Sequence, residues 1–415
     1  MARLNVSRMI ERIEYLATIS ATAENGVTRF SFTDQSERAN DIVQQWMEEA
    51  GMKVHRDGVN NLIGRYEGTD PYSPVLMIGS HIDSVKEGGK YDGVLGVIAG
   101  IEVVTQLFER EIRPNRSIEV VAFCDEEGAR FHTSLIGSRA MAGQLTDEDL
   151  QTADEQGITL SDAMRQVGLD PANYASAKRD PKTVHSYLEL HIEQGPILQE
   201  ENQPCGVVMG IAGALRYNFC ILGMAGHAGT VPMSLRKDAL TGTAEMMMAI
   251  EQIANQYPPL VATVGRLNVQ PGVGNVIPGT VVGTLDIRDT DEQRKLQVAS
   301  EMLSACEQIC RQRGLESRFE LVTQSPAVRC SPRLVALIEN ALIKRNIKPL
   351  KLQSGAGHDA MAIAGVCDVG MIFVRCKDGV SHHPDEYASP SDIETATEIL
   401  FDVVLNECIQ TSEVN

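Results

Sequence analysis

The chain has 415 residues, of which 43% are hydrophobic and 22% are charged, as in a soluble globular protein with two domains. Its net charge of −19 at pH 7 argues against nucleic acids and anionic membrane surfaces as partners. No apolar run reaches the roughly 18–20 residues that span a bilayer, so we expect no membrane-spanning segment.

The cysteines and the first residues bear on the compartment. The nine cysteines, an odd number, are widely spaced and form no Cys-x-x-Cys pair, which is typical of free thiols in a reducing environment. Residues 1–20 are amphipathic and charged, unlike a signal peptide with an unbroken apolar centre. The sequence therefore predicts a cytoplasmic protein.

Apolar residues recur at helical spacing in residues 9–16 and 42–47, so we expect helices early in the chain. Short continuous apolar runs of the kind found in buried strands follow at residues 75–78, 118–123, 187–190 and 371–374. Helical segments such as residues 94–109 separate these runs. The alternation predicts an α/β domain with a largely parallel sheet.

The middle of the chain has a different order of elements. We expect strand, helix, strand, strand, helix, strand at residues 217–222, 238–256, 261–269, 281–287, 293–313 and 318–322. This is the ferredoxin-like order. It predicts a second domain over residues 213–329, inserted into a first domain of residues 1–212 and 330–415. We expect the strand at 217–222 to form a sheet edge, where a second copy of the chain can pair to give a homodimer.

Five short polar stretches each offer a metal ligand at or soon after the end of an apolar run. Their candidate ligands are His81, Asp92, Glu127, His191 and His382. Ligands in open α/β sheets gather beyond the carboxyl ends of the strands. Imidazoles and carboxylates without cysteine suit two divalent ions such as zinc or manganese, and cobalt or nickel also accept them. A two-metal site in turn indicates hydrolysis of an unreactive bond.

Each motif alone has a simpler structural interpretation. His81-x-Asp83 is often a surface pair, Asp92 before a helix is often a cap, and Glu126-Glu127 are often solvated charges. Together, in this order and near strand ends, they favour a metal site. Asp83 can accept the second ring N–H of His81, and one acid of the Glu126-Glu127 pair can bind metal while its neighbour acts as a general base.

Longer motifs carry a resemblance to a known family. They are Gly-Ser-His-Ile-Asp-Ser-Val (79–85), Asp-Glu-Glu-Gly-Ala-Arg-Phe (125–131), Glu-Leu-His-Ile-Glu-Gln-Gly (189–195), Ala-Gly-His-Ala-Gly-Thr-Val-Pro-Met (225–233), Ser-Gly-Ala-Gly-His-Asp-Ala (354–360) and Asp-Gly-Val-Ser-His-His-Pro (378–384). Over essentially its whole length the chain resembles the hydantoinase/carbamoylase amidases, within a clan of dinuclear zinc aminoacylases and carboxypeptidases. The resemblance implies a dinuclear-zinc aminopeptidase-like α/β catalytic domain with an inserted ferredoxin-like α+β lid and dimerisation domain.

The resemblance also implies roles for individual residues. The first metal would be held by His81, Asp92 and His191, and the second by Asp92 as a bridge, Glu127 and His382. Glu126 would be the general base. The family pattern Ser-His-x-Pro selects His382, although the adjacent His383 leaves an alternative.

Further polar residues are expected to contact the substrate. Arg288 can grip a carboxylate with its planar fork, although its spacing also favours a salt bridge with Asp286 or Asp289. Asn275 is either a turn residue or a substrate contact. His227 is expected to polarise the scissile carbonyl, acting in the active site of a partner subunit. The remaining expected contacts are Gln194, Arg216, Gly357 and His358.

The resemblance predicts hydrolysis of a linear ureido C–N bond in a small carboxylate, with release of ammonia and carbon dioxide. The motifs at 226–233 and 354–361 look closest to allantoate-type enzymes. N-carbamoyl-L-amino acids, ureidoglycolate and β-ureidopropionate are the alternatives. An aminoacylase or peptidase of the same clan is a more distant alternative. A binding protein on an inactive hydrolase fold is disfavoured because Glu126 and every expected ligand are present.

Overall fold

A computed structural model describes residues 4–22 and 26–409, which divide into two compact units. The first unit contains residues up to 209, with residues 330–352 and those from 357 onward. The second contains residues 210–329 together with residues 353–356. The short stretch 353–356, placed in the first domain by the sequence, joins the second unit because Ser354 O accepts the N–H of Ala212 at 2.8 Å.

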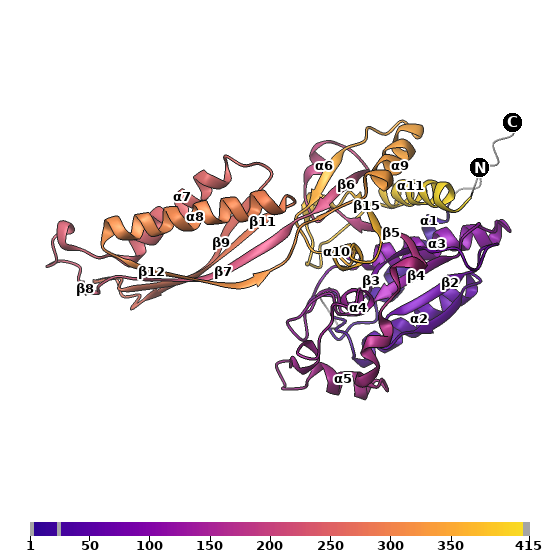
Figure 1. Cartoon of the computed structure of the whole chain (residues 1–415), viewed down its shortest axis with the longest axis horizontal. Helices are drawn as coiled ribbons and strands as arrows, with labels where there is room; N and C mark the ends of the chain where they lie inside the picture. Colours follow the sequence, from indigo (N-terminus) through magenta and orange to yellow (C-terminus); the bar gives the residue numbers. More distant parts are fainter. Residues whose placement is uncertain (1–3, 23–25, 410–415) are drawn as a thin grey trace. The chain divides into compact units, whose positions relative to one another are not determined.

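The described residues of the first unit and its borders build a nine-stranded sheet (Figure 1). Its strands lie in the order β1 (Lys53–Arg56), β2 (Leu62–Tyr66), β4 (Ile118–Phe123), β3 (Val75–His81), β5 (Val184–Ile192), β15 (Asp368–Val374), β6 (Cys205–Ile211) and β13 (Val328–Arg329), while β14 (Lys351–Ser354) pairs with β6 off this path. Only the centre, β4–β3–β5–β15, is parallel. The outer pairings β1–β2, β2–β4, β15–β6 and β6–β13 are antiparallel, so the expected largely parallel sheet is in fact mixed.

Helices accompany this sheet. They are α1 (Val6–Ala17), α2 (Asp34–Glu49), α3 (Val94–Glu109), α4 (Ile136–Met141), α5 (Leu160–Gln166), α6 (Ile197–Glu200), α9 (Pro332–Lys344), α10 (Ala360–Ile363) and α11 (Pro390–Cys408). Helix α3 is mostly apolar, is buried from Val94 to Leu107, and contacts β3, β4 and β5. Across the described residues, no helix combines the length and apolar composition needed to cross a membrane.

The parallel centre determines where the polar motifs meet. Strands β3 and β4 are buried along their whole length, because Val, Ile, Leu and Phe fill both faces. His81 is the last residue of β3 and is registered with Phe123 of β4. His191, near the end of β5, is registered with Phe373 of β15. Since these strands run in the same direction, the two histidines reach the same edge of the sheet.

The second unit has the ferredoxin-like topology that the sequence predicts. Its elements follow the chain as β7 (Gly213–Leu222), α7 (Ala239–Ala254), β9 (Val261–Gln270), β11 (Thr280–Asp289), α8 (Glu292–Arg313) and β12 (Glu316–Gln324). The four strands form an antiparallel sheet in the order β12–β7–β11–β9. Helices α7 and α8 lie on one face of the sheet (Figure 1), and their apolar side chains share a core with those of the strands.

One prediction about this sheet is wrong. The strand at 217–222 is not an edge, because β7 is hydrogen-bonded to β11 on one side and β12 on the other. In the ferredoxin-like order the first strand lies inside the sheet, and the second and fourth strands form its edges. The edges available for pairing with another chain are therefore β9 and β12.

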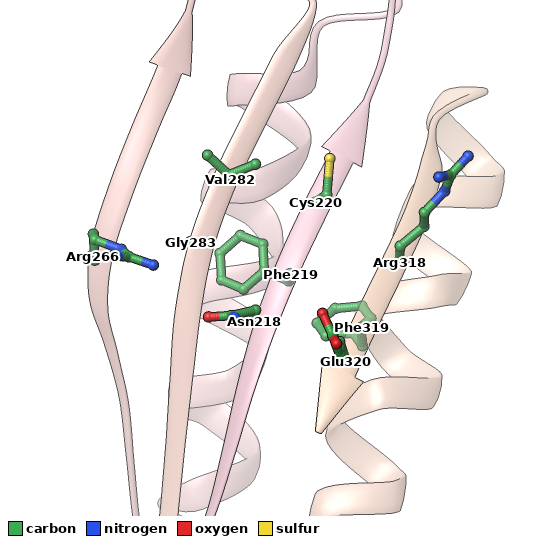
Figure 2. Close-up of a pocket in the computed structure, with 9 residues that line it drawn as sticks. All are labelled: Asn218, Phe219, Cys220, Arg266, Val282, Gly283, Arg318, Phe319 and Glu320. Atoms are coloured by element: carbon green, nitrogen blue, oxygen red, sulfur yellow. The ribbon is translucent and has the colours of Figure 1, made fainter. Parts of the chain in front are cut away.

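The face of this sheet that lacks helices carries an open hollow of about 460 Å³ with a mixed polar and apolar lining. Figure 2 shows its lining, which includes Asn218 and Cys220 from β7, Arg266 from β9 and Arg318 from β12. The described residues that line it include none of the predicted catalytic, metal or substrate residues.

Candidate metal centre

Two histidines at the strand ends present the same ring nitrogen to a common point. The Nδ1 of His81 lies 3.1 Å from the main-chain oxygen of Asp83, and the Nδ1 of His191 lies 2.9 Å from that of Ile192. A ring N–H donated to a carbonyl fixes the tautomer and leaves Nε2 as the free lone pair. Both Nε2 atoms face Asp92 Oδ1, at 3.6 Å from His81 and 3.1 Å from His191.

Asp92 reaches this point from the turn that precedes helix α3. The N-cap of that helix is Gly93, whose backbone has a φ of 65°. A Cβ atom at Gly93 would lie 2.4 Å from the ring of His81, so only glycine allows this approach. Ligand atoms of His81, Asp92 and His191 all lie within 4.8 Å of one another, and all three side chains are buried.

The other carboxylate oxygen of Asp92 belongs to a second cluster. Asp92 Oδ2 lies 3.2 Å from His382 Nε2, which lies 3.6 Å from Glu127 Oε1. Two atoms that each lie about 2.0–2.2 Å from one zinc ion are at most about 4.4 Å apart. The four separations given above satisfy this limit, so these residues could hold two divalent ions, with one oxygen of Asp92 available to each.

The adjacent histidines have different surroundings. His382 takes part in the second cluster, whereas the Nδ1 of His383 accepts the N–H of Asp385 at 3.2 Å and its side chain is 59% exposed. Of the tandem pair, the structure therefore brings His382, and not His383, to Asp92.

Glu126 and Glu127 lie side by side at the centre. Glu126 Oε2 is 3.8 Å from His81 Nε2, and His81, Glu126 and Glu127 form a further group of potential ligands. The carboxylate of Asp83 accepts the main-chain N–H groups of both glutamates at 3.2 Å. The nearer carboxylate oxygen of Asp83 is 3.6 Å from His81 Nδ1, which is too far for a hydrogen bond. The partner of His81 Nδ1 is therefore the main-chain oxygen of Asp83, and not the carboxylate that the sequence suggested.

Three buried acids in and beside this cluster have raised pKa values. Burial raises the pKa of Glu126 well above its ordinary value, against the opposing charge of His81. Burial and the charge of Asp92 raise the pKa of Glu127 to about 7. Burial and Glu189 raise the pKa of Asp359 well above its ordinary value. Divalent cations would supply positive charge and keep such carboxylates ionised.

Backbone strain is present in the loops that bring these side chains together. Asp125, Gln194 and His382 adopt φ values of 55°, 56° and 54°, in the left-handed region that non-glycine residues seldom occupy. Such conformations cost about 1–3 kcal/mol each and are often found at functional sites. Asp125 directly precedes Glu126, and Gln194 and His382 are themselves predicted site residues.

Other residues border the bridging carboxylate. Gln194 Nε2 donates to Asp92 Oδ2 at 2.8 Å and lies 3.1 Å from Ser381 Oγ, which is itself 3.0 Å from Asp92 Oδ2. His358 is buried, with its ring centroid 4.5 Å from that of His191. Sequence reasoning missed Ser381 and Glu386. The only signal for Ser381 was its place before His382, and the partners of Glu386 are mostly main-chain atoms.

The substrate residues predicted in the second unit form two groups. Asp286 binds two arginines: Arg288 Nε at 2.8 Å and Arg216 Nε at 2.7 Å. Arg288 Nη1 also donates to the carbonyl of Gly355 at 2.6 Å. The salt bridge with Asp286 that the spacing allowed is thus present, and it holds the Arg288 fork in a fixed orientation.

His227 and Asn275 form the second group. Strand β8 (Gly226–His227) pairs with β10 (Val276–Ile277), which brings the two loops together, and Asn275 O accepts the N–H of Ala228 at 3.0 Å. His227 is exposed, and its Nδ1 accepts the N–H of Gly229 at 3.1 Å. At Gly357, in the first unit, the nearest atom to an added Cβ is Met361 Sδ at 3.7 Å, so space remains beside this backbone.

The sequence profile of peptidase family M20/M25/M40 matches residues 77–406, and the chain belongs to this family. A crystal structure described as an amidase of the hydantoinase/carbamoylase family from Burkholderia multivorans superposes with a TM-score of 0.92, at 33% identity and 98% coverage of both chains. The resemblance and fold class predicted from the motifs are thereby confirmed.

Two curated relatives have different names. The N-carbamoyl-L-amino acid amidohydrolase of Geobacillus stearothermophilus is 45% identical over 96% of this chain and 97% of its own. The allantoate deiminase of Arabidopsis thaliana is 37% identical over 93% of this chain and 79% of its own. Both names describe hydrolysis of carbon–nitrogen bonds, but they differ in the substrate.

Proposed function

We propose that this protein hydrolyses the linear ureido C–N bond of a small carboxylate with the help of two divalent cations. The observation that supports this proposal best is the position of Asp92, whose oxygens face His81 and His191 on one side and His382 on the other. Zinc, manganese, cobalt and nickel all accept this donor set. The cations, when bound, supply Lewis acidity that lowers the pKa of a water molecule and polarises a carbonyl.

Glu126 would carry out both proton transfers, and His227 would stabilise the charge that develops between them. Glu126, next to His81 and held through its main chain by Asp83, takes the proton of the attacking water. Glu126 returns this proton to the departing nitrogen, so that one group acts first as base and then as acid. His227 donates a hydrogen bond to the developing oxyanion. The departing nitrogen is that of the carboxylate-bearing half of the substrate. The carbamoyl group is released as carbamate, which decomposes to ammonia and carbon dioxide.

The choice between substrates rests on two observations that point in different directions. The relative with 45% identity is named for N-carbamoyl-L-amino acids, which makes them the first candidates. The motifs at 226–233 and 354–361, together with a relative named as an allantoate deiminase, support allantoate as the second. Both substrates carry a carboxylate. Arg288 would bind it through the two N–H groups, one on each terminal nitrogen, that its bonds to Asp286 and Gly355 leave unused.

An ammonia-release assay tests the proposal. The purified protein, loaded with manganese or zinc, is offered N-carbamoyl-L-methionine, allantoate, ureidoglycolate and N-carbamoyl-β-alanine at equal concentrations. Turnover of at least one of them, lost on chelation and restored by metal, is the expected result. No ammonia from any of the four would refute the ureido substrate class.

The family's name provides a second candidate function, a peptidase. The motifs add an aminoacylase of the same clan to this candidate. An N-acetyl-amino acid and a dipeptide, assayed by release of free amino acid, distinguish this candidate. Cleavage of these compounds with no ammonia from the ureido acids would favour it.

We further propose a cytoplasmic homodimer that forms through the second unit, with β9 or β12 as the pairing edge in place of β7.

A further inference from the structure

The carboxylate of Glu386 joins two loops that carry predicted metal ligands. Its Oε1 accepts the main-chain N–H of Tyr91 at 2.8 Å and that of Asp92 at 3.1 Å. Its Oε2 lies 3.3 Å from the hydroxyl of Ser381, next to His382 in sequence. One side chain therefore connects the Asp92 loop to the His382 loop, which lies almost 300 residues further along the chain.

The surroundings of Glu386 are built to accept this carboxylate. Glu386 is 2% exposed, and its carboxylate lies against the two main-chain N–H groups and the Ser381 hydroxyl. A Cβ atom on Gly89 would lie 2.0–2.3 Å from the atoms of the carboxyl group, so glycine leaves the space that it occupies. Burying a carboxylate costs free energy unless hydrogen bonds replace its lost hydration, and here the two main-chain N–H groups supply such bonds.

We propose that Glu386 is a positioning residue that fixes Asp92 in the orientation in which its two oxygens serve two cations. Glu386 binds the main chain of Asp92, and the Ser381 hydroxyl lies between Glu386 Oε2 and Asp92 Oδ2. The carboxylate thus restrains the bridge directly through its main chain. Ser381, whose single hydroxyl proton is donated to only one of the two carboxylates at a time, lies beside the side chain of the bridge. The inference rests on the metal centre of the proposed function and is independent of the substrate.

Glu386→Met tests this role because methionine has a similar length but cannot accept the two N–H groups. Loss of a partner that orients a metal ligand typically lowers metal affinity about 10–100-fold. We expect a loss of this size for both equivalents of cobalt, measured by titrating the apoprotein and following the visible absorption of Co²⁺. The visible spectrum should also change shape. Glu386→Gln should recover most of the affinity, since its amide oxygen can still accept both N–H groups.

Glu193 offers a matched control. It is also a buried glutamate that accepts two main-chain N–H groups, from Ile197 at 2.8 Å and Leu198 at 2.9 Å, but these groups lie in helix α6 and not in a ligand loop. Glu193→Met should bind cobalt as the wild type does. Gly89→Ala provides a second test if Glu386→Met does not fold, because the new Cβ displaces the carboxylate without removing it.

The outcomes separate the inference from the proposed function. Wild-type affinity and spectrum in Glu386→Met, or in Gly89→Ala when only that variant folds, would overturn the inference alone. Failure of the wild type to bind cobalt would overturn the metal centre and the inference together. A negative substrate assay affects neither measurement, because no substrate is present.

Discussion

Replacement of Glu126 by glutamine isolates the proton-transfer step from metal binding. The amide has nearly the same shape, and the main-chain N–H at this position stays bound to Asp83, so the loop should not move. Glutamine cannot accept the proton of water. Loss of a general base typically costs about 10²–10⁴-fold in rate, which corresponds to about 2.7–5.4 kcal/mol in the activation free energy.

Glu127→Gln is the matched comparison, since it makes the same replacement of a carboxylate by an amide at the adjacent residue. Glu127 lies with Asp92 and His382 in one cluster, and we expect its variant to bind the second cation more weakly. Turnover and metal content by elemental analysis are measured for both proteins. The expected pattern is two metals with little activity for Glu126→Gln, and reduced metal for Glu127→Gln.

Two results for Glu126→Gln would contradict the role of Glu126 as general base. Because Glu126 Oε2 lies 3.8 Å from His81 Nε2, Glu126 is close enough to act as a ligand itself. Loss of metal from the Glu126→Gln protein would show that Glu126 is a metal ligand. A variant that keeps its metal and more than a tenth of the wild-type rate would remove Glu126 from the role of general base.

Three further predictions concern the metal ligands and the second unit. His382→Ala should lower the metal content while His383→Ala should not, and equal losses in elemental analysis would contradict the assignment of His382 alone. Arg288→Lys should raise KM about 10–100-fold for a carboxylate substrate and much less for its uncharged amide, because an ammonium cannot reproduce the planar fork; equal losses would make Arg288 structural. Mixing inactive His227→Ala with inactive Glu126→Gln should restore activity if His227 acts in the partner's site, and no recovery after verified subunit exchange would place it otherwise.

The positions of the predicted ligands can be inferred from the sequence because the sequence indicates where the buried strands end. Continuous apolar runs mark β3, β5 and β15, and in a parallel arrangement the residues after such runs reach one edge of the sheet. This is why His81 and His191, more than a hundred residues apart, meet at Asp92. The sequence did not reveal the antiparallel outer strands, since a run of apolar residues carries no information about the direction of its neighbour.

Strand adjacency was also the reason for the error at β7. The order of elements correctly indicated a ferredoxin-like unit, and that topology places its first strand inside the sheet. The alternation of residues in β7 reflects one face packed on α7 and α8 and one face exposed, which is the same for an inner strand and an edge strand. Side-chain pattern reports which face is buried, and only backbone pairing decides which strand is at the edge.

The orienting residues were the hardest to predict, because main-chain N–H groups are their principal partners. A period-two pattern suggested that Asp83 would face the ring of His81, but β3 ends at His81 and the extended geometry does not continue. The Asp83 carboxylate turns instead to the N–H groups of Glu126 and Glu127, as Glu386 does to those of Tyr91 and Asp92. Since every residue except proline offers an N–H group, such a carboxylate needs no particular residue type opposite it. Metal ligands can be recognised from their chemistry, whereas the acids that hold their loops in place become visible only when the fold brings the loops together.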